Sequence, residues 1–270
     1  MKTLLHPLTG KAFRMGRKRP RARGLRLRLA SYLLKSLPHP PVECNYAPAA
    51  KSWLAQMLAN DDLGDCTAAG AFHIAGTWLA NNGLPVPFTQ EDTIKFYSAT
   101  TGYVPGKPET DQGGDEETVL NYWVNHGLLP APLPAHQAQA WISVNAADIE
   151  EVKTAIWLFG NVYIGASLPD AWVNPMPETD GWIWSAAGAP EDDNGHCFAA
   201  LGYDERWLKI STWGLVGNLT PAGLAKYGVR AAGGECYSIL GPDWISAAKQ
   251  KAPNGFDALQ LASDINDMRA

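Results

Sequence analysis

The sequence predicts an α+β fold in which helices dominate the first part of the chain and strands the second. Helix-type patterns and strand-type patterns are segregated along the chain, as is typical of α+β proteins. The expected helices cover 66–81, 91–99, 115–126 and 149–159, and the expected strands cover 162–167, 195–204 and 207–214. With 270 residues, 46% of them hydrophobic, the chain can bury a sizeable core in one large domain or two smaller ones.

The first helix begins at Cys66, directly after the turn-forming run Asn60-Asp61-Asp62-Leu63-Gly64-Asp65. Unpaired N–H groups and the positive end of the helix dipole stabilise a thiolate at this position, and the thiolate is the reactive form of cysteine. A cysteine on an Ala-rich helix is also a common buried core residue. Motifs further along the chain decide between these two interpretations.

The second and third helices are separated by a long loop that contains Gly113-Gly114. The helix at 115–126 has acidic residues in its first turn, apolar residues at 119, 120, 123 and 124, and Gly127 as its stop. The helix at 149–159 leads through Gly160 into the apolar strand at 162–167. These signals predict a helical layer that is connected directly to a sheet.

The strand from Gly195 to Tyr203 ends in a Gly-Tyr-Asp turn, and a second strand returns from it. His196 begins the first of these strands, and Ser211 lies near the end of the second. Cross-strand neighbours in a hairpin contact each other, so we expect His196 and Ser211 to face one another.

The four cysteines, at positions 44, 66, 197 and 236, have no CxxC pair and no metal-ligand spacing. We therefore expect no metal and no cofactor. The sequence does not decide whether the chain contains one structural disulfide. No apolar run reaches the length of a membrane span, and no secretory signal precedes the body. We expect a protein that has no membrane partner and that resides in the cytoplasm or within a viral particle.

The first 35 residues carry 11 Lys or Arg and no acidic residue, so the rest of the chain has a net charge of −16. Such a segment has too little apolar surface to fold alone. We expect residues 1–40 to be a basic arm, 41–245 the folded domain and 246–270 a helical tail. The arm either lies on the acidic body or binds nucleic acid or an acidic protein surface within a larger assembly.

Four motifs, in order and spacing, resemble the papain family of cysteine peptidases. Gly64-Asp65-Cys66-Thr67-Ala68-Ala69 is similar to the family's Gly-Ser-Cys-Trp-Ala-Phe, and Gly113-Gly114 to its Gly-Gly segment. The strand that begins at Gly195-His196 resembles the family's His strand, and Ser211-Thr212-Trp213-Gly214 its Asn-Ser-Trp-Gly. His196 follows Cys66 by 130 residues, within the family's range of about 130–150. The resemblance covers residues 41–245.

This resemblance implies a two-lobed papain-like fold, with a helical lobe that carries Cys66 and a β-rich, barrel-like lobe that carries His196. His196 would take the thiol proton, and the thiolate would attack a peptide carbonyl. The Cys66 N–H and the Asn60 side-chain amide would hold the oxyanion, and Ser211 would orient the imidazole. The substrate-binding residues that the resemblance implies are Gly64, Gly113, Gly114, Cys197 and Trp213.

Several positions depart from the family pattern. Asn60 replaces a longer Gln, and Ser211 stands where the family has Asn, unless the alignment shifts by one and Thr212 takes this place. Thr67 replaces an aromatic residue after the nucleophile. The resemblance also leaves no room for the family's long inhibitory pro-segment, so an active enzyme would need another restraint.

Three interpretations follow from the sequence: an active peptidase, an inactive papain-fold module of an assembly such as a virion, or Cys-His chemistry applied to acyl transfer or cell-wall amides. An open cleft with the Cys66 sulfur close to His196 favours an enzyme. A cleft filled by the chain itself or by another subunit favours the assembly module. The Trp-rich segment 172–184 is the expected plug, and core packing is its alternative role.

Overall fold

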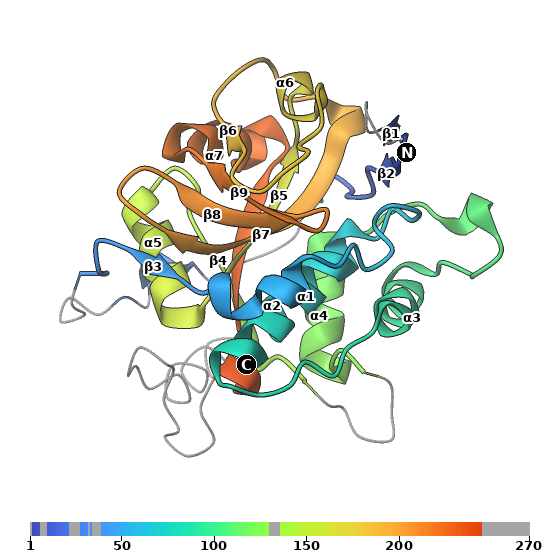
Figure 1. The fold of residues 1–270 in the computed structure, drawn as a ribbon, viewed down its shortest axis with the longest axis horizontal. Coiled ribbons are helices and arrows are strands. Elements are labelled where there is room, and N and C mark those ends of the chain that lie inside the picture. Colours follow the sequence, from blue (N-terminus) through green and yellow to red (C-terminus); the bar gives the residue numbers. More distant parts are fainter. Residues whose placement is uncertain are drawn as a thin grey trace.

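A computed structural model of the chain describes residues 2–5, 10–21, 28–31, 33, 39–129 and 136–244 (Figure 1). The predicted C-terminal tail at 246–270 and parts of the basic arm lie outside these residues. All four cysteines are free thiols. Within the described ranges, no helix has both the length and the apolar character that a membrane crossing requires.

The helical lobe is built around α2, which spans Cys66–Asn81 and is buried from Cys66 to Leu79. Small residues on all faces of this helix let its neighbours approach closely. Thr89 and Asp92 form a capping box that begins α3, and Asp115 accepts a hydrogen bond from the Thr118 N–H to begin α4. The helices around α2 are α1 (Lys51–Leu54), α3 (Gln90–Thr101) and α4 (Glu116–His126).

The β-rich lobe is a single eight-stranded sheet with the strand order β4-β10-β5-β7-β8-β9-β6, and β3 pairs with β7. Its strands are β3 (Cys44–Asn45), β4 (Ala140–Ser143), β5 (Val162–Ser167), β6 (Ile183–Trp184), β7 (Gly195–Tyr203), β8 (Leu208–Thr212), β9 (Leu215–Leu219) and β10 (Glu235–Leu240). The helices of this lobe are α5 (Ile149–Phe159), α6 (Asp170–Val173) and α7 (Pro221–Tyr227). Figure 1 shows the sheet beside the helical lobe.

The two lobes meet where α2 packs against β5 and β7. Gly70 allows this approach, since a Cβ atom there would come 3.0 Å from the Tyr163 ring and 3.5 Å from the Cys197 sulfur. The Tyr163 hydroxyl donates a hydrogen bond of 2.7 Å to the carbonyl of Thr67. These contacts bring the first turn of α2 to the start of β7, and therefore Cys66 to the end of the sheet that holds His196.

The predicted two-lobed α+β fold is confirmed, and the helices and strands predicted between residues 66 and 214 form. The sequence patterns missed the helices α1, α6 and α7 and the strands β3, β4, β6, β9 and β10. They also missed two short strands in the arm, β1 (Thr3–Leu5) and β2 (Ala12–Arg14), which pair with each other. A part of the arm therefore has secondary structure of its own.

Candidate active site

Cys66 is the first residue of α2, and its side chain is 1% exposed. Burial raises the pKa of its thiol to about 12, although backbone N–H groups of Cys197 and Gly16 act in the opposite direction. The neighbouring carboxyl group of Asp65 raises the same pKa further. In this state the sulfur is held as a neutral thiol, because a thiolate is too poorly solvated to form.

His196 lies at the start of β7 and is fully buried. Its Nε2 is 2.6 Å from Oγ1 of Thr212, and its ring stacks on the indole of Trp213 at a centroid distance of 4.2 Å. Burial lowers the pKa of His196 to about 3, and the positive charge of Arg17 lowers it further. Among the described residues, Nδ1 of His196 has no hydrogen-bond partner. It therefore makes no hydrogen bond with the Cys66 thiol.

The register of the hairpin decides which hydroxyl orients the imidazole. Ala199 lies opposite Ser211, and side chains alternate along a strand, so His196 shares a face with Thr212. The predicted contact between His196 and Ser211 is therefore wrong, and the alternative with Thr212 is what the fold forms. Ser211 points to the other face, where its hydroxyl has no partner within the described part of the chain.

A two-residue turn between β8 and β9 places Trp213 over this site. Trp213 has φ 52° and Gly214 has φ 72°, values that fit the tight turn favoured in hairpins. A bulky residue rarely adopts a positive φ, so the surrounding structure must hold Trp213 in it. The result is an indole that covers the pair formed by His196 and Thr212.

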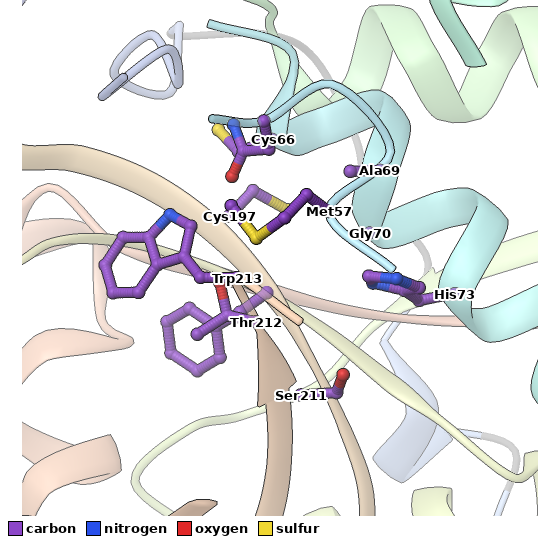
Figure 2. Close-up of a pocket in the computed structure, with 11 residues that line it drawn as sticks. Met57, Cys66, Ala69, Gly70, His73, Cys197, Ser211, Thr212 and Trp213 are labelled. Atoms are coloured by element: carbon purple, nitrogen blue, oxygen red, sulfur yellow. The ribbon is translucent and has the colours of Figure 1, made fainter. Parts of the chain in front are cut away.

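Asn60 lines the same small pocket as Cys66, between α2 and the ends of β7 and β8. Figure 2 shows this pocket, with Cys66, Thr212 and Trp213 among the residues around it. Its side-chain amide donates to the carbonyl of Leu63 at 3.2 Å and so is engaged within its own loop. The free volume of about 10 Å³ is close to that of one water molecule. The other residues in the wall of this pocket are Met57, Ala69, Gly70, His73, Cys197, Phe198, Ser211, Thr212 and Trp213. The pocket is too small in this state to admit a peptide.

The predicted substrate-binding glycines hold the chain's own N-terminal segment. The Gly114 N–H donates to the carbonyl of Gly16 at 2.7 Å, and the Lys18 N–H donates back to the carbonyl of Gly114 at 2.8 Å. On the other lobe, the Arg17 N–H donates to the carbonyl of Gly195 at 3.1 Å. Residues 12–19, which we call the blocking segment, thus run between the lobes across Cys66.

Glycine is required where the blocking segment passes the helical lobe. A Cβ atom on Gly16 would lie 1.8 Å from the carbonyl oxygen of Gly64, and one on Gly113 would lie 1.8 Å from the carbonyl oxygen of Gly16. Backbone therefore packs directly on backbone at the thiol. No side chain larger than hydrogen fits at Gly16 while the segment remains in place.

The side chain of Arg17 is completely buried beside the thiol site. Its Nε donates to Glu116 at 3.0 Å, Nη2 donates to Glu235 at 3.1 Å, and Nη1 donates to the carbonyl of Gly233 at 2.6 Å. Cys197, one of the predicted substrate-binding residues, lies next to this cluster, and its Sγ donates a hydrogen bond to Glu116 at 3.3 Å. Sequence reasoning missed this cluster, because Arg17 was one charge among many and Glu116 fitted the first turn of a helix.

Other basic side chains of the arm pair with carboxylates of the body. Lys11 lies 3.0 Å from Asp61, and Arg14 lies 2.9 Å from the buried carboxylate of Asp111. Arg19 forms an exposed ion pair with Asp192. The described part of the arm therefore lies on the acidic body, as one of the two interpretations of its charge predicted.

The Trp-rich segment 172–184 supports the site and does not fill it. Trp172 and Trp184 are buried and stack on each other at 4.6 Å, and Trp184 packs edge-on against Trp213 at 5.9 Å. The expected plug was therefore wrong, and core packing is the role that this segment has. Within the described ranges, no three His, Cys, Asp or Glu side chains are grouped as a metal site would need.

Comparisons with known proteins find similar structures but no matching sequence. No protein-family model matches the chain, and no curated protein matches it in sequence. Similar solved structures include xylellain, a cysteine protease from Xylella fastidiosa, with a TM-score of 0.59 and 12% identity over 84% of this chain and 97% of that one. Digestive procathepsin L2 from Tenebrio molitor larval midgut has a TM-score of 0.54 and 11% identity over 80% of this chain and 73% of that one.

A third similar structure contains the cysteine protease and lectin-like domains of Cwp84 from Clostridium difficile. It has a TM-score of 0.52 and 14% identity over 76% of this chain and 53% of that one. Sequence identities this low support a shared fold and nothing more. The shared fold agrees with the position of Cys66 on α2 and of His196 on β7. The chain has the fold of the papain-like cysteine proteases.

Proposed function

We propose that this chain is a latent cysteine peptidase, with Cys66 as nucleophile and His196 as base, and that the blocking segment must leave before it acts. One observation carries the proposal. The site already binds an extended polypeptide across the cysteine, through backbone hydrogen bonds to Gly114 on one lobe and Gly195 on the other. A peptide substrate needs the same kind of backbone contact.

The residues at the site have defined roles in this reaction. Thr212 accepts a hydrogen bond from the Nε2–H of His196, which leaves Nδ1 free to take the proton of the Cys66 thiol. The thiolate adds to the peptide carbonyl, and His196 returns the proton to the leaving amine. Water then releases the acyl group from the sulfur. The Cys66 N–H at the start of α2 faces the developing oxyanion.

The closed state cannot carry out these steps, because a thiol with a pKa of about 12 does not give its proton to an imidazole with a pKa of about 3. Removal of the blocking segment lets water reach both groups and takes Arg17 away from His196. The pKa of the thiol then falls and that of the imidazole rises. The segment is the restraint that the sequence alone did not locate.

A second candidate function has support from the same observation. A site filled by the chain itself is also what an inactive papain-fold module would have, with the arm as a permanent part of its structure. The two candidates differ in whether the blocking segment can be displaced to leave a working site.

The test is peptidase activity of the full chain carrying Gly16→Leu, which cannot keep the segment in place. We expect casein cleavage by this variant, little by the wild type, and none when Cys66→Ser or His196→Ala is added. Arg19→Ala, which removes the exposed ion pair with Asp192, is the matched control. Arg17→Glu offers an independent opening by repulsion from Glu116. Absence of activity in both folded, opened variants would favour the inactive module.

The opened variant also tests the assignment of Thr212. We expect Thr212→Ala to lower kcat about 10- to 100-fold, since a misplaced imidazole loses its alignment with the thiol. Ser211→Ala, one residue away and on the opposite face of β8, should leave kcat nearly unchanged. Steady-state kinetics in the Gly16→Leu background measure kcat for both substitutions. An equal loss of kcat in the two variants would contradict the assignment of Thr212.

A further inference from the structure

We infer that the pocket formed by Glu116, Glu235 and the carbonyl of Gly233 is a recognition site for an arginine side chain of an extended peptide substrate. Arg17 occupies this pocket in the closed state. The inference rests on the proposed function and names the substrate class: peptides with arginine next to the residue that faces Cys66. The arm then acts as an internal copy of the side chain that the site selects.

The pocket matches a guanidinium group and not simply a positive charge. Three different nitrogens of Arg17 each donate to a different acceptor, at distances of 2.6 to 3.1 Å. A planar guanidinium presents donors in these fixed directions, whereas a lysine ammonium is a single point charge. The side chains of Arg17 and Glu116 are both fully buried. A neutral side chain in this place would leave Oε2 of Glu116 and Oε1 of Glu235 without the donors that Arg17 supplies.

The acceptors are held by groups other than Arg17. Oε2 of Glu235 lies 2.7 Å from the Tyr237 hydroxyl and 3.3 Å from Arg230. Oε1 of Glu116 accepts from Cys197 at 3.3 Å. Contacts of this kind fix a site before its ligand arrives, so departure of Arg17 would leave an arranged pocket.

A glycine makes the room that the arginine needs. Gly165 lies on β5, at the floor of the pocket, and a Cβ atom there would come 2.1 Å from both Nε of Arg17 and Oε2 of Glu116. Any larger residue at 165 would close the pocket. The sequence thus leaves a space of the right size beside two acidic side chains.

The backbone contacts fix where the arginine lies relative to the chemistry. Gly114 and Gly195 bind the main chain around Arg17, and the preceding Gly16 has its N–H against the Cys66 sulfur. The recognised side chain is therefore one residue away from the position at the thiol. Recognition at that distance positions a peptide without interfering with the reacting atoms.

The first experiment refills the pocket in the full chain carrying Arg17→Ala. Ethylguanidinium has the atoms that this substitution removes, and ethylurea is its neutral counterpart. We expect ethylguanidinium at about ten times its Kd to raise the unfolding temperature of Arg17→Ala by about 3–5 °C, and ethylurea to have no effect. The wild type, whose pocket is full, should not respond, and adding Glu235→Gln should weaken the response at least about 10-fold.

The second experiment uses the opened Gly16→Leu variant and internally quenched peptides in which arginine, or citrulline in its place, either follows a glycine, as Arg17 follows Gly16, or precedes it. We expect kcat/KM for the arginine peptide to be higher than for its citrulline counterpart by about 10²-fold or more, because neutral citrulline leaves the buried carboxylates without the charged donor that Arg17 supplies. Equal kcat/KM values, or equal effects of ethylguanidinium and ethylurea on folded Arg17→Ala, would overturn the inference while leaving the peptidase intact. Refilling by ethylguanidinium without cleavage of any peptide would retain the pocket and overturn the proposed function.

Discussion

Arg17→Met is expected to lower the free energy of unfolding by about 3–5 kcal/mol at pH 8, the usual cost of removing one partner from a buried ion pair. Methionine fills much of the same space, so the loss reports on charge and hydrogen bonds more than on a cavity. Glu116 would lose the guanidinium that neutralises it, and Glu235 would keep only its contact with the more exposed Arg230.

The size of this loss should depend on pH. Burial raises the pKa of Glu116, Arg17 lowers it, and Glu235 raises it, so removal of Arg17 lets the pKa rise further. The folded variant then binds more protons than the unfolded chain at pH values above the unfolded pKa of about 4.3. Stability is highest at low pH in such a case and falls as the pH rises. We expect a smaller deficit at pH 5 than at pH 8.

Denaturant unfolding of both proteins at pH 5 and pH 8 measures the effect. Arg19→Ala is the matched control: it removes an arginine of the same segment from an exposed ion pair and should change stability little at either pH. An unfolding midpoint of Arg17→Met equal to that of the wild type at pH 8 would contradict the burial of this ion cluster.

The sequence predicted those parts of the fold that depend on local patterns. The break in polarity at Cys66 marked the start of α2, and the acidic first turn and Gly127 marked both ends of α4. Gly195 to Tyr203 was evident as a strand from its apolar run and its turn. Short strands such as β4 were missed, because four residues carry too little periodicity to be told from a loop.

The predictions that were wrong or missing concern contacts between residues that are far apart in the sequence. Ser211 and Thr212 are adjacent hydroxyl residues, and only the register of β7 with β8 decides which one shares a face with His196. Arg17 lies 99 positions before Glu116 and 218 before Glu235. Nothing in the local sequence links them, although the basic arm and the acidic body together indicated that some such contact was available.

The second large effect concerns the reactivity of Cys66 when the blocking segment leaves. In the closed state a thiol pKa of about 12 leaves very little thiolate at pH 7.5. Exposure that returns the pKa to about 8.5 raises the thiolate fraction by about 10³-fold, and the lower nucleophilicity of the less basic thiolate offsets part of this gain. We expect alkylation of Cys66 to be at least about 10²-fold faster in Gly16→Leu than in the wild type. Steric access adds to this factor, since Cys66 is 1% exposed in the closed state.

The most direct measurement is iodoacetamide labelling of Cys66 at pH 7.5, read by peptide mass spectrometry in the wild type, in Gly16→Leu and in Gly16→Leu with His196→Ala. We expect slow labelling in the wild type, fast labelling confined to Cys66 in the opened variant, and slow labelling again when His196 is removed. Fast labelling of the wild type would show that the blocking segment does not cover the thiol. Equal rates with and without His196 would show that no imidazole activates it.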